Sequence, residues 1–169
     1  LSSRRVPIIY SPHCFAFERS DYPAPVRAAF FVAEGILARN TTGFTGCSAH
    51  EIELIHRLSS RPADFVANIA RAEAIAGASA RPPVHSAPVT VAMVGRLAPQ
   101  KGMSVFARMA REVVQRTNVR ALWIGGGPEK FATELRASGV EITGWVSSQE
   151  VAEHLRDVDL YVHTGQWEG

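Results

Sequence analysis

Cysteine is scarce in this sequence, and its charges nearly cancel. Only two cysteines, Cys14 and Cys47, occur among 169 residues, and neither has metal-ligand spacing, so reduced thiols in apolar surroundings are expected rather than a disulfide. The 18 lysines and arginines against 16 acidic residues leave a net charge of +2. Without a basic stripe interleaved with aromatic residues, this balance argues against a nucleic-acid-binding protein.

Long hydrophobic runs and leader segments are also absent. No apolar stretch is long enough to cross a bilayer, and the chain does not open with a signal peptide. We therefore expect a cytoplasmic protein, and peripheral contact with the inner face of a membrane is compatible with this expectation. Because the sequence opens on Leu1 rather than methionine and stops at Gly169 after a strand-like run, we interpret it as an internal fragment of a longer protein.

Residues 89–102 carry the strongest local pattern. Residues 89–94 form an apolar run typical of a strand covered on both faces, and Gly95 ends that run. Helical spacing begins at residue 103, so Arg96 and Lys101 lie between a strand and a helix N-terminus. Two cations and the positive end of a helix dipole can bind a diphosphate. Two solvated loop cations are the alternative, since neither a Walker loop nor a dinucleotide fingerprint is present.

Strands and helices alternate through the rest of this half. We expect strands at residues 120–124, 140–143 and 159–163, and helices at residues 103–117, 128–138 and 149–157. Four strands alternating with three helices predict a parallel, doubly wound α/β sheet with right-handed crossovers. Ligands of such sheets bind at the carboxyl ends of the strands. The residues expected at that edge are Arg96, Gly125, Gly126, Gly127, Gly144, Trp145 and Glu168.

The first half alternates less regularly. We expect strands at residues 6–10, 44–47 and 65–69, a loop at 14–25, a helix at 26–39 and another helix after residue 48. Phe30, Ala33 and Leu37 are assigned to the buried face of the first helix. Ser48 and Glu51 have the spacing of a capping box that opens the second helix.

A change of composition separates the two halves. Residues 71–88 are rich in alanine and proline and read as an interdomain linker, whose first part, residues 71–78, has the pattern of a helical turn or two. The predicted domains are therefore residues 1–70 and residues 89–169.

Four motifs follow one another in the second domain. They are GRLAPQKG at residues 95–102, IGGGP at 124–128, GWVSSQEV at 144–151 and DLYVHTGQWEG at 159–169. Together they resemble the first half of the nucleotide-sugar domain of retaining glycosyltransferases of family 4, also called group 1, which have the two-domain GT-B fold. Upstream, YSPHCFAFER at residues 10–19 and FTGCSAHE at 44–51 resemble the acceptor side of the same family. The implied fold is α/β, with two incomplete Rossmann-like domains whose parallel sheets carry helices on both faces.

The resemblance implies a donor site in the second domain. Arg96 and Lys101 match the cationic pair on the donor diphosphate, next to Gly95 at the strand end. Residues 125–127 match a glycine-rich turn that lets the backbone approach the nucleotide, and a tight turn without such contact is the alternative. Glu168 matches the first of two glutamates that reach the donor sugar and the ribose.

Two further segments are assigned by the same resemblance. Gly144, Trp145 and Val146 match the segment beside the base, where Trp145 either stacks on the base or packs in the core. His13 matches a histidine near the reacting centre, unless it is a plain loop histidine. His163 lies inside a predicted strand and is expected to be a core residue.

The implied reaction is metal-free transfer of a sugar from a nucleoside diphosphate to a carbohydrate or lipid-linked acceptor, with retention at the anomeric carbon. No cofactor is implied beyond the donor substrate, and no glycosidase-type carboxylate pair can be assigned. The sequence departs from the family pattern where Asn68 is followed by Ile69 instead of glycine. Strands are also missing from both domains, so inactivity of the segment on its own is one expectation.

Other functions stay open at this point. A nucleotide-sugar epimerase or phosphorylase of the same architecture would use a similar phosphate-binding edge, and a non-catalytic nucleotide-binding module would need no second glutamate. A dinucleotide oxidoreductase fits least, because the turn at residues 125–127 lacks the third spaced glycine. The donor sugar, the base, the acceptor and the oligomeric state are not determined by the sequence.

Overall fold

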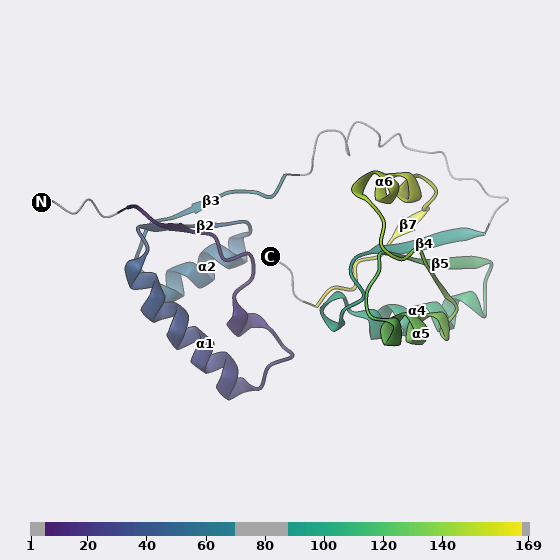
Figure 1. Ribbon diagram of the computed structural model, residues 1–169, viewed down its shortest axis with the longest axis horizontal. Coiled ribbons are helices and arrows are strands. Elements are labelled where there is room, and N and C mark those ends of the chain that lie inside the picture. Colours follow the sequence, from purple (N-terminus) through teal and green to yellow (C-terminus); the bar gives the residue numbers. More distant parts are fainter. Residues whose placement is uncertain (1–5, 70–87, 167–169) are drawn as a thin grey trace, which may run out of the picture. The chain divides into compact units, whose positions relative to one another are not determined.

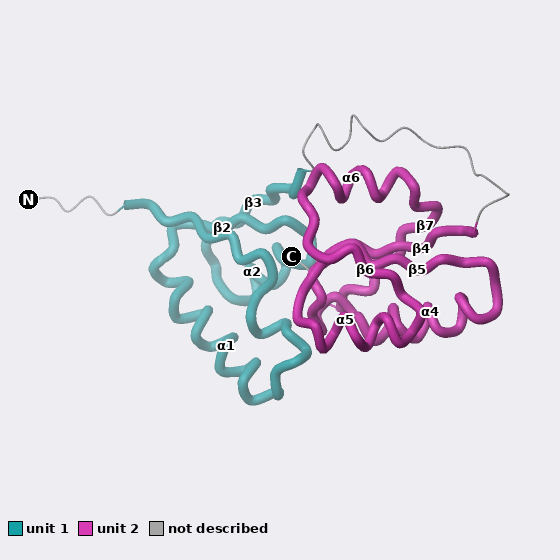
Figure 2. Tube along the Cα trace, turned by 45° about the vertical axis from the view of Figure 1, so that its right-hand side comes forward, with its two compact units in different colours: residues 1–69, 167–169 teal, residues 70–166 magenta. Residues whose placement is uncertain are grey.

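The computed structural model describes residues 6–69 and 88–166. The chain divides after Ile69 into two compact units, coloured separately in Figure 2. Residues 6–69 belong to unit 1 and residues 88–166 to unit 2. The linker predicted at residues 71–88, with its helical turns at 71–78, lies almost wholly outside the described residues.

Unit 1 contains a parallel sheet of three short strands in the order β1-β2-β3. These are β1 (Ile9–Tyr10), β2 (Gly43–Gly46) and β3 (Ala63–Phe65), joined through α1 (Ala24–Leu37) and α2 (Ala49–Leu58). Figure 1 shows α1 and α2 on the same side of the strands. The register pairs Tyr10 with Phe44 and Phe44 with Ala63, and all three side chains belong to the core that these helices cover.

The strands of unit 1 differ in extent from the prediction. β1 keeps only the last two residues of the predicted 6–10, and β3 shares only Phe65 with the predicted 65–69. The residues beyond β3 are solvent-exposed, with Ile69 at 88%. Apolar composition alone therefore predicted β1 too long and β3 too late, because β2 pairs only with Ile9–Tyr10 on one side and with Ala63–Phe65 on the other.

Helix α1 is apolar but lies at the surface. It begins after Pro23, with Pro25 in its first turn, where a proline costs no backbone hydrogen bond. None of its residues is fully buried, and of the three predicted core positions only Phe30 is even partly covered. Leu37 is 61% exposed, so the prediction of a buried face for Ala33 and Leu37 is wrong. Phe30 packs against the core of unit 1 and also stacks on Tyr22, with ring centroids 5.5 Å apart.

Unit 2 contains a four-stranded sheet in the order β6-β5-β4-β7. Its strands are β4 (Val89–Val94), β5 (Val119–Ile124), β6 (Val140–Ile142) and β7 (Leu160–Tyr161). All three strand pairings are parallel, which confirms the predicted architecture. The strand order runs outward from β4 to β6 and then returns to the other side of β4, so β4 and β7 form a topological switch point.

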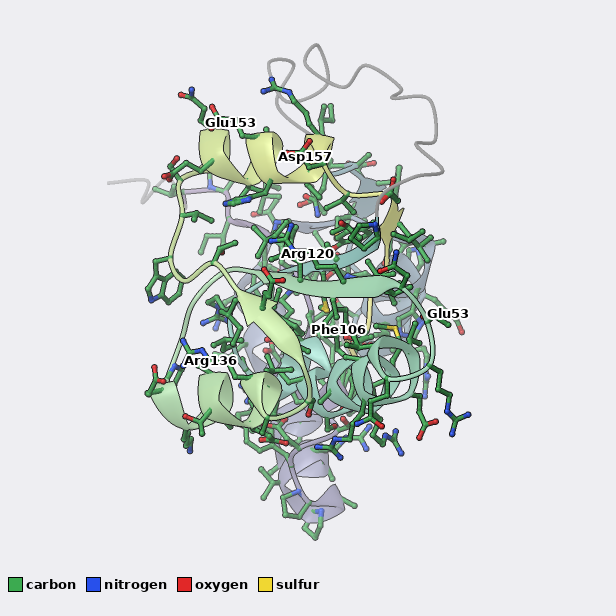
Figure 3. The ribbon with its side chains drawn as sticks, turned by 90° about the vertical axis from the view of Figure 1, so that its right-hand side faces the viewer. Glu53, Phe106, Arg120, Arg136, Glu153 and Asp157 are labelled. Atoms are coloured by element: carbon green, nitrogen blue, oxygen red, sulfur yellow. The ribbon has the colours of Figure 1, made fainter. Side chains whose placement is uncertain are left out.

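Three helices cover the two faces of this sheet. They are α4 (Met103–Val114), α5 (Glu129–Arg136) and α6 (Ser148–Arg156). Figure 1 shows α4 and α5 on one face and α6 on the other. In Figure 3, Phe106 on α4 lies below β5, while Glu153 and Asp157 lie above it, on α6 and at its end. Among the described residues, no helix combines the length and apolarity needed to cross a membrane.

The core of unit 2 explains its continuous apolar strands. Met93 and Trp123 face α4, where the Trp123 ring meets Phe106 edge-to-face with centroids 5.4 Å apart. Their strand neighbours Ala92 and Leu122 face the opposite layer. Because both faces of β4 and β5 are covered, every position of these strands is a candidate for an apolar side chain.

Candidate functional site

The loops that follow the four strands of unit 2 lie at one edge of its sheet. Since the strands are parallel, their carboxyl ends share that edge. The segments that leave it are residues 95–98, 125–128, 143–147 and 162–166. The sequence-predicted donor residues that the structure describes are therefore gathered at the switch-point edge. Glu168 lies outside the described residues.

Lys101 lies against the end of β4. A Cβ atom built on Gly95 would be 3.3 Å from both Cγ and Cδ of Lys101, so the lysine stem packs over the bare glycine backbone. Arg96 follows Gly95 directly and is exposed to solvent. The structure thus places both predicted cations at the same strand end.

The first turn of α4 begins beside this lysine. Gly102 is the N-cap residue and has a left-handed φ of 65°, a conformation that favours glycine. Its carbonyl oxygen accepts from the backbone amides of Val105 and Phe106 at 2.9 and 3.1 Å. The amino end of α4, with its positive dipole end, therefore adjoins Lys101 at the carboxyl edge.

The three consecutive glycines are each required by neighbouring protein atoms. A Cβ atom on Gly125 would lie 2.2 Å from the carbonyl oxygen of Gly95, and Gly125 also has a φ of 138°. On Gly126 it would lie 2.7 Å from the backbone nitrogen of Trp145, and on Gly127 it would lie 2.7 Å from Cβ of Leu97. Close packing between loops accounts for the run, and its contact with a nucleotide stays a prediction.

Trp145 projects from this edge. Its side chain is 72% exposed, so the alternative of a core tryptophan is wrong. Gly144 turns the chain with a φ of 78°, and the next residue, Val146, packs against the core instead. Stacking of the exposed indole on a base stays a prediction.

His163 is also exposed, contrary to the prediction of a core residue. β7 ends at Tyr161, before His163 is reached, and both residues of this edge strand are solvent-exposed. The His163 ring lies alongside that of Tyr161, with centroids 6.3 Å apart. Among the described residues β7 is an outer strand of the sheet, a position that the apolar pattern does not reveal, and this explains the difference.

In unit 1, His13 follows the carboxyl end of β1 and is exposed. His13 and Cys14 have left-handed φ values of 45° and 79°, which are uncommon for residues other than glycine. Cys14 and Cys47 are thiols rather than a disulfide, as expected. Since His13 belongs to unit 1 and Arg96 to unit 2, their meeting at one reacting centre stays a prediction.

The sequence analysis did not foresee what Glu51 does. Ser48 Oγ accepts from the backbone amide of Glu51 at 3.1 Å, as in a capping box. The carboxylate does not return to Ser48. It accepts from the backbone amides of Cys14 at 2.9 Å and Cys47 at 2.7 Å, and so fastens the turn after β1 to the end of β2. Only half of the predicted capping box is present, because two backbone amides compete for its carboxylate.

Glu51 carries its charge although it is buried, with 4% of the residue exposed. Burial alone would raise the pKa of Glu51. The hydrogen bonds donated by the amides of Cys47 and Cys14 outweigh that effect, and the pKa of Glu51 is lowered. The same surroundings, burial first, raise the pKa of the Cys47 thiol. The negative charge of Glu51 is therefore a structural element of unit 1.

A cavity of about 700 Å³ also occurs in unit 1. It is lined by α1 from Phe31 to Ile36 and by residues 58–62, which lead into β3. These segments precede β2 and β3, so the cavity lies at the amino ends of the strands, whereas His13 follows a carboxyl end. The cavity and the predicted reacting centre are thus at opposite edges. In residues 6–69 and 88–166, no group of three or more His, Cys, Asp and Glu side chains could hold a metal ion.

Comparison with known proteins shows what the second unit resembles. Residues 88–169 match the family described as glycosyl transferases group 1. Over these residues the chain is therefore similar to glycosyltransferase domains of group 1. The chain is also 33% identical, over 79 residues, to a GDP-mannose-dependent alpha-mannosyltransferase of Corynebacterium glutamicum. That alignment covers 46% of this chain and 18% of the relative.

Solved structures extend the likeness to both units. HepE from Anabaena, crystallised with UDP and glucose, matches 95% of this chain with a TM-score of 0.69 and 14% identity. TarM from S. aureus matches 99% of it with a TM-score of 0.71 and 16% identity. At such identities the likeness shows the fold, which is that of GT-B glycosyltransferases. The chain spans 47% of HepE and 34% of TarM.

Replacing Glu51 with glutamine should destabilise the protein by about 1–3 kcal/mol at neutral pH, because an amide side chain can accept from only one of the two amides. Because the pKa of Glu51 is lower in the folded than in the unfolded state, its contribution to the free energy of unfolding is fully present above the unfolded-state pKa of about 4.3. That contribution is lost as the pH falls through the lower folded-state pKa. Urea unfolding between pH 7 and pH 3 measures it. Glu53→Gln, an exposed change on the same helix, is the control. A wild-type advantage over Glu51→Gln that persists undiminished at pH 3 would contradict this account.

Replacing Gly125 with alanine should destabilise the protein by about 2–5 kcal/mol, since backbone strain adds to overlap with the Gly95 carbonyl. Gly144 is the matched control, because it also has a positive φ but no atom lies within 4 Å of its added Cβ. Gly144→Ala should cost only the strain, about 1–2 kcal/mol. Equal losses in thermal or urea unfolding would show that loop packing does not require Gly125.

Proposed function

We propose that this chain is the central part of a retaining glycosyltransferase that moves a sugar from a nucleoside-diphosphate sugar to an acceptor. The observation that carries this proposal is the placement of Lys101 over Gly95, beside Arg96 and the amino end of α4. Two cations and a helix N-terminus then adjoin the switch point of a group 1 glycosyltransferase domain.

The chemistry of the leaving group gives these residues their roles. As the bond between sugar and diphosphate breaks, negative charge builds on the diphosphate oxygens. Arg96 and Lys101 would stabilise that charge more strongly in the transition state than in the ground state. Arg96 offers a planar fork to two oxygens, whereas Lys101 supplies a single charge on a flexible stem. With this much fixed positive charge, we infer that departure of the diphosphate needs no metal ion.

The donor and acceptor classes are proposed from relatives. The Corynebacterium enzyme is named for GDP-mannose, and HepE was crystallised with UDP and glucose. GDP-mannose and UDP-glucose are therefore the first donors to test. The acceptor is proposed to be a carbohydrate or a lipid-linked sugar, bound on the side of unit 1 that carries His13.

In the full-length protein, Arg96→Ala and Lys101→Ala should each lower sugar transfer by about 100-fold or more, because each removes a preorganised charge from the leaving group. Arg96→Lys should restore part of the rate, since charge returns without the fork. The measurement is transfer of label from GDP-mannose and UDP-glucose, with thermal unfolding of the same variants. Arg108→Ala, which removes an exposed arginine from α4, is the control. Wild-type rates for both site variants would place the phosphate site elsewhere.

Transfer should persist in excess EDTA, and the product should keep the anomeric configuration of the donor. NMR of the glycosidic product determines the configuration, and the EDTA series uses the same assay. An inverted product would refute retention, and loss of activity restored by a divalent cation would refute metal independence. Interconversion of donors without transfer would indicate the epimerase alternative.

A further inference from the structure

The loop after β7 is fastened to the turn that carries Lys101. The hydroxyl of Thr164 lies 2.8 Å from the carbonyl oxygen of Lys101. Two residues further on, the backbone amide of Gln166 donates to the carbonyl oxygen of Gln100 at 2.9 Å. Two hydrogen bonds thus join residues 162–166 to residues 99–101, although these segments are more than 60 residues apart.

Gly102 permits this close approach. A Cβ atom on Gly102 would lie 1.8 Å from the carbonyl oxygen of Thr164, so the backbone of the loop fills the space of the missing side chain. The left-handed φ of Gly102 independently favours glycine. The contact between the loop and the start of α4 is therefore built into the backbone of both segments.

The Thr164 hydroxyl has two acceptors within reach. Met93 Sδ lies 2.9 Å away and the Lys101 carbonyl oxygen 2.8 Å away. A hydroxyl has one hydrogen, and a carbonyl oxygen is a much stronger acceptor than a thioether sulfur. The hydrogen bond to Lys101 is accordingly the one that Thr164 makes.

The backbone of Lys101 is thereby held on both sides. Its amide donates to the carbonyl oxygen of Ala98 at 3.0 Å, and its carbonyl accepts from Thr164. The stem then lies over Gly95. Because a lysine side chain is flexible, the region that its ammonium group can reach depends on how firmly its Cα is held.

We propose that Thr164 is a positioning residue that acts through Lys101. Its hydroxyl sets the place from which the Lys101 side chain leaves the edge of β4, and so sharpens binding of the diphosphate. This inference rests on the proposed function, in which Lys101 contacts the diphosphate. A hydroxyl that only stabilised the fold would affect diphosphate and nucleoside binding alike.

The test uses the full-length protein with Thr164→Val, which keeps the side-chain shape and removes the donor, and Thr164→Ser, which keeps the donor. Binding of GDP and guanosine, and of UDP and uridine, is measured by calorimetry below the unfolding temperature of every variant. Thr164→Val should weaken binding of the diphosphate that the wild type prefers by about 3- to 10-fold, as expected for one hydrogen bond, with nucleoside binding unchanged. Thr164→Ser should stay within about 2-fold of wild type. Equal weakening of diphosphate and nucleoside, or no weakening by Thr164→Val, would overturn the inference.

A double-mutant cycle with Lys101→Ala separates the two levels of the proposal. If Thr164 acts through Lys101, Thr164→Val should have little further effect on diphosphate binding in the Lys101→Ala background. The same fold-change in both backgrounds would overturn the positioning role. If Lys101→Ala itself leaves diphosphate binding unchanged, the proposed phosphate site is wrong. If Lys101→Ala weakens binding while Thr164→Val does not, only the role of Thr164 fails.

Discussion

Parallel pairing of β4 on both sides is the constraint on which unit 2 depends. Because β5 and β7 run in the same direction as β4, each connection crosses a face of the sheet, and all following loops leave from one edge. Because the strand order reverses at β4, the connections that lead to β5 and β6 lie on one face of the sheet, and the connection that leads to β7 lies on the other face. The residues brought to that edge come from segments far apart in the sequence, and the architecture of the sheet alone brings them together.

The two units hold their strand-end loops by different means. In unit 2, glycines let backbone meet backbone, as where Gly125 lies against the carbonyl of Gly95. In unit 1, a buried carboxylate does the corresponding work, since Glu51 binds amides from the ends of both β1 and β2. The contacts in unit 2 require glycines, which have no side chain. The contacts in unit 1 require a buried carboxylate whose hydrogen bonds outweigh the cost of its desolvation.

Much of unit 2 could be predicted because its signals are local. The apolar run of β4 occurs as expected. The capping box of Ser147 and Glu150 at the start of α6, with bonds of 2.7 and 3.3 Å, is equally local, because its two residues are three positions apart. The carboxylate of Glu51 was mispredicted because its partner Cys14 lies 37 residues away, where a local pattern cannot show it. Exposure of Trp145 and Leu37 was likewise hidden, since it depends on which elements cover them. The positions of Arg96 and Lys101 at the sheet edge could be predicted, but the hydroxyl of Thr164 against Lys101 could not.

The place of β7 beside β4 also sets an order for synthesis on the ribosome. Thr90 of β4 donates its amide to the carboxylate of Asp159, 69 residues later, at the start of β7. At about 5–20 residues per second, β4 and β5 can pair several seconds before β7 is available. During that interval one edge of β4 has no strand beside it, and an open edge is where a nascent chain can pair wrongly. Of the four strands described in this sheet, β7 is thus the last to be synthesised.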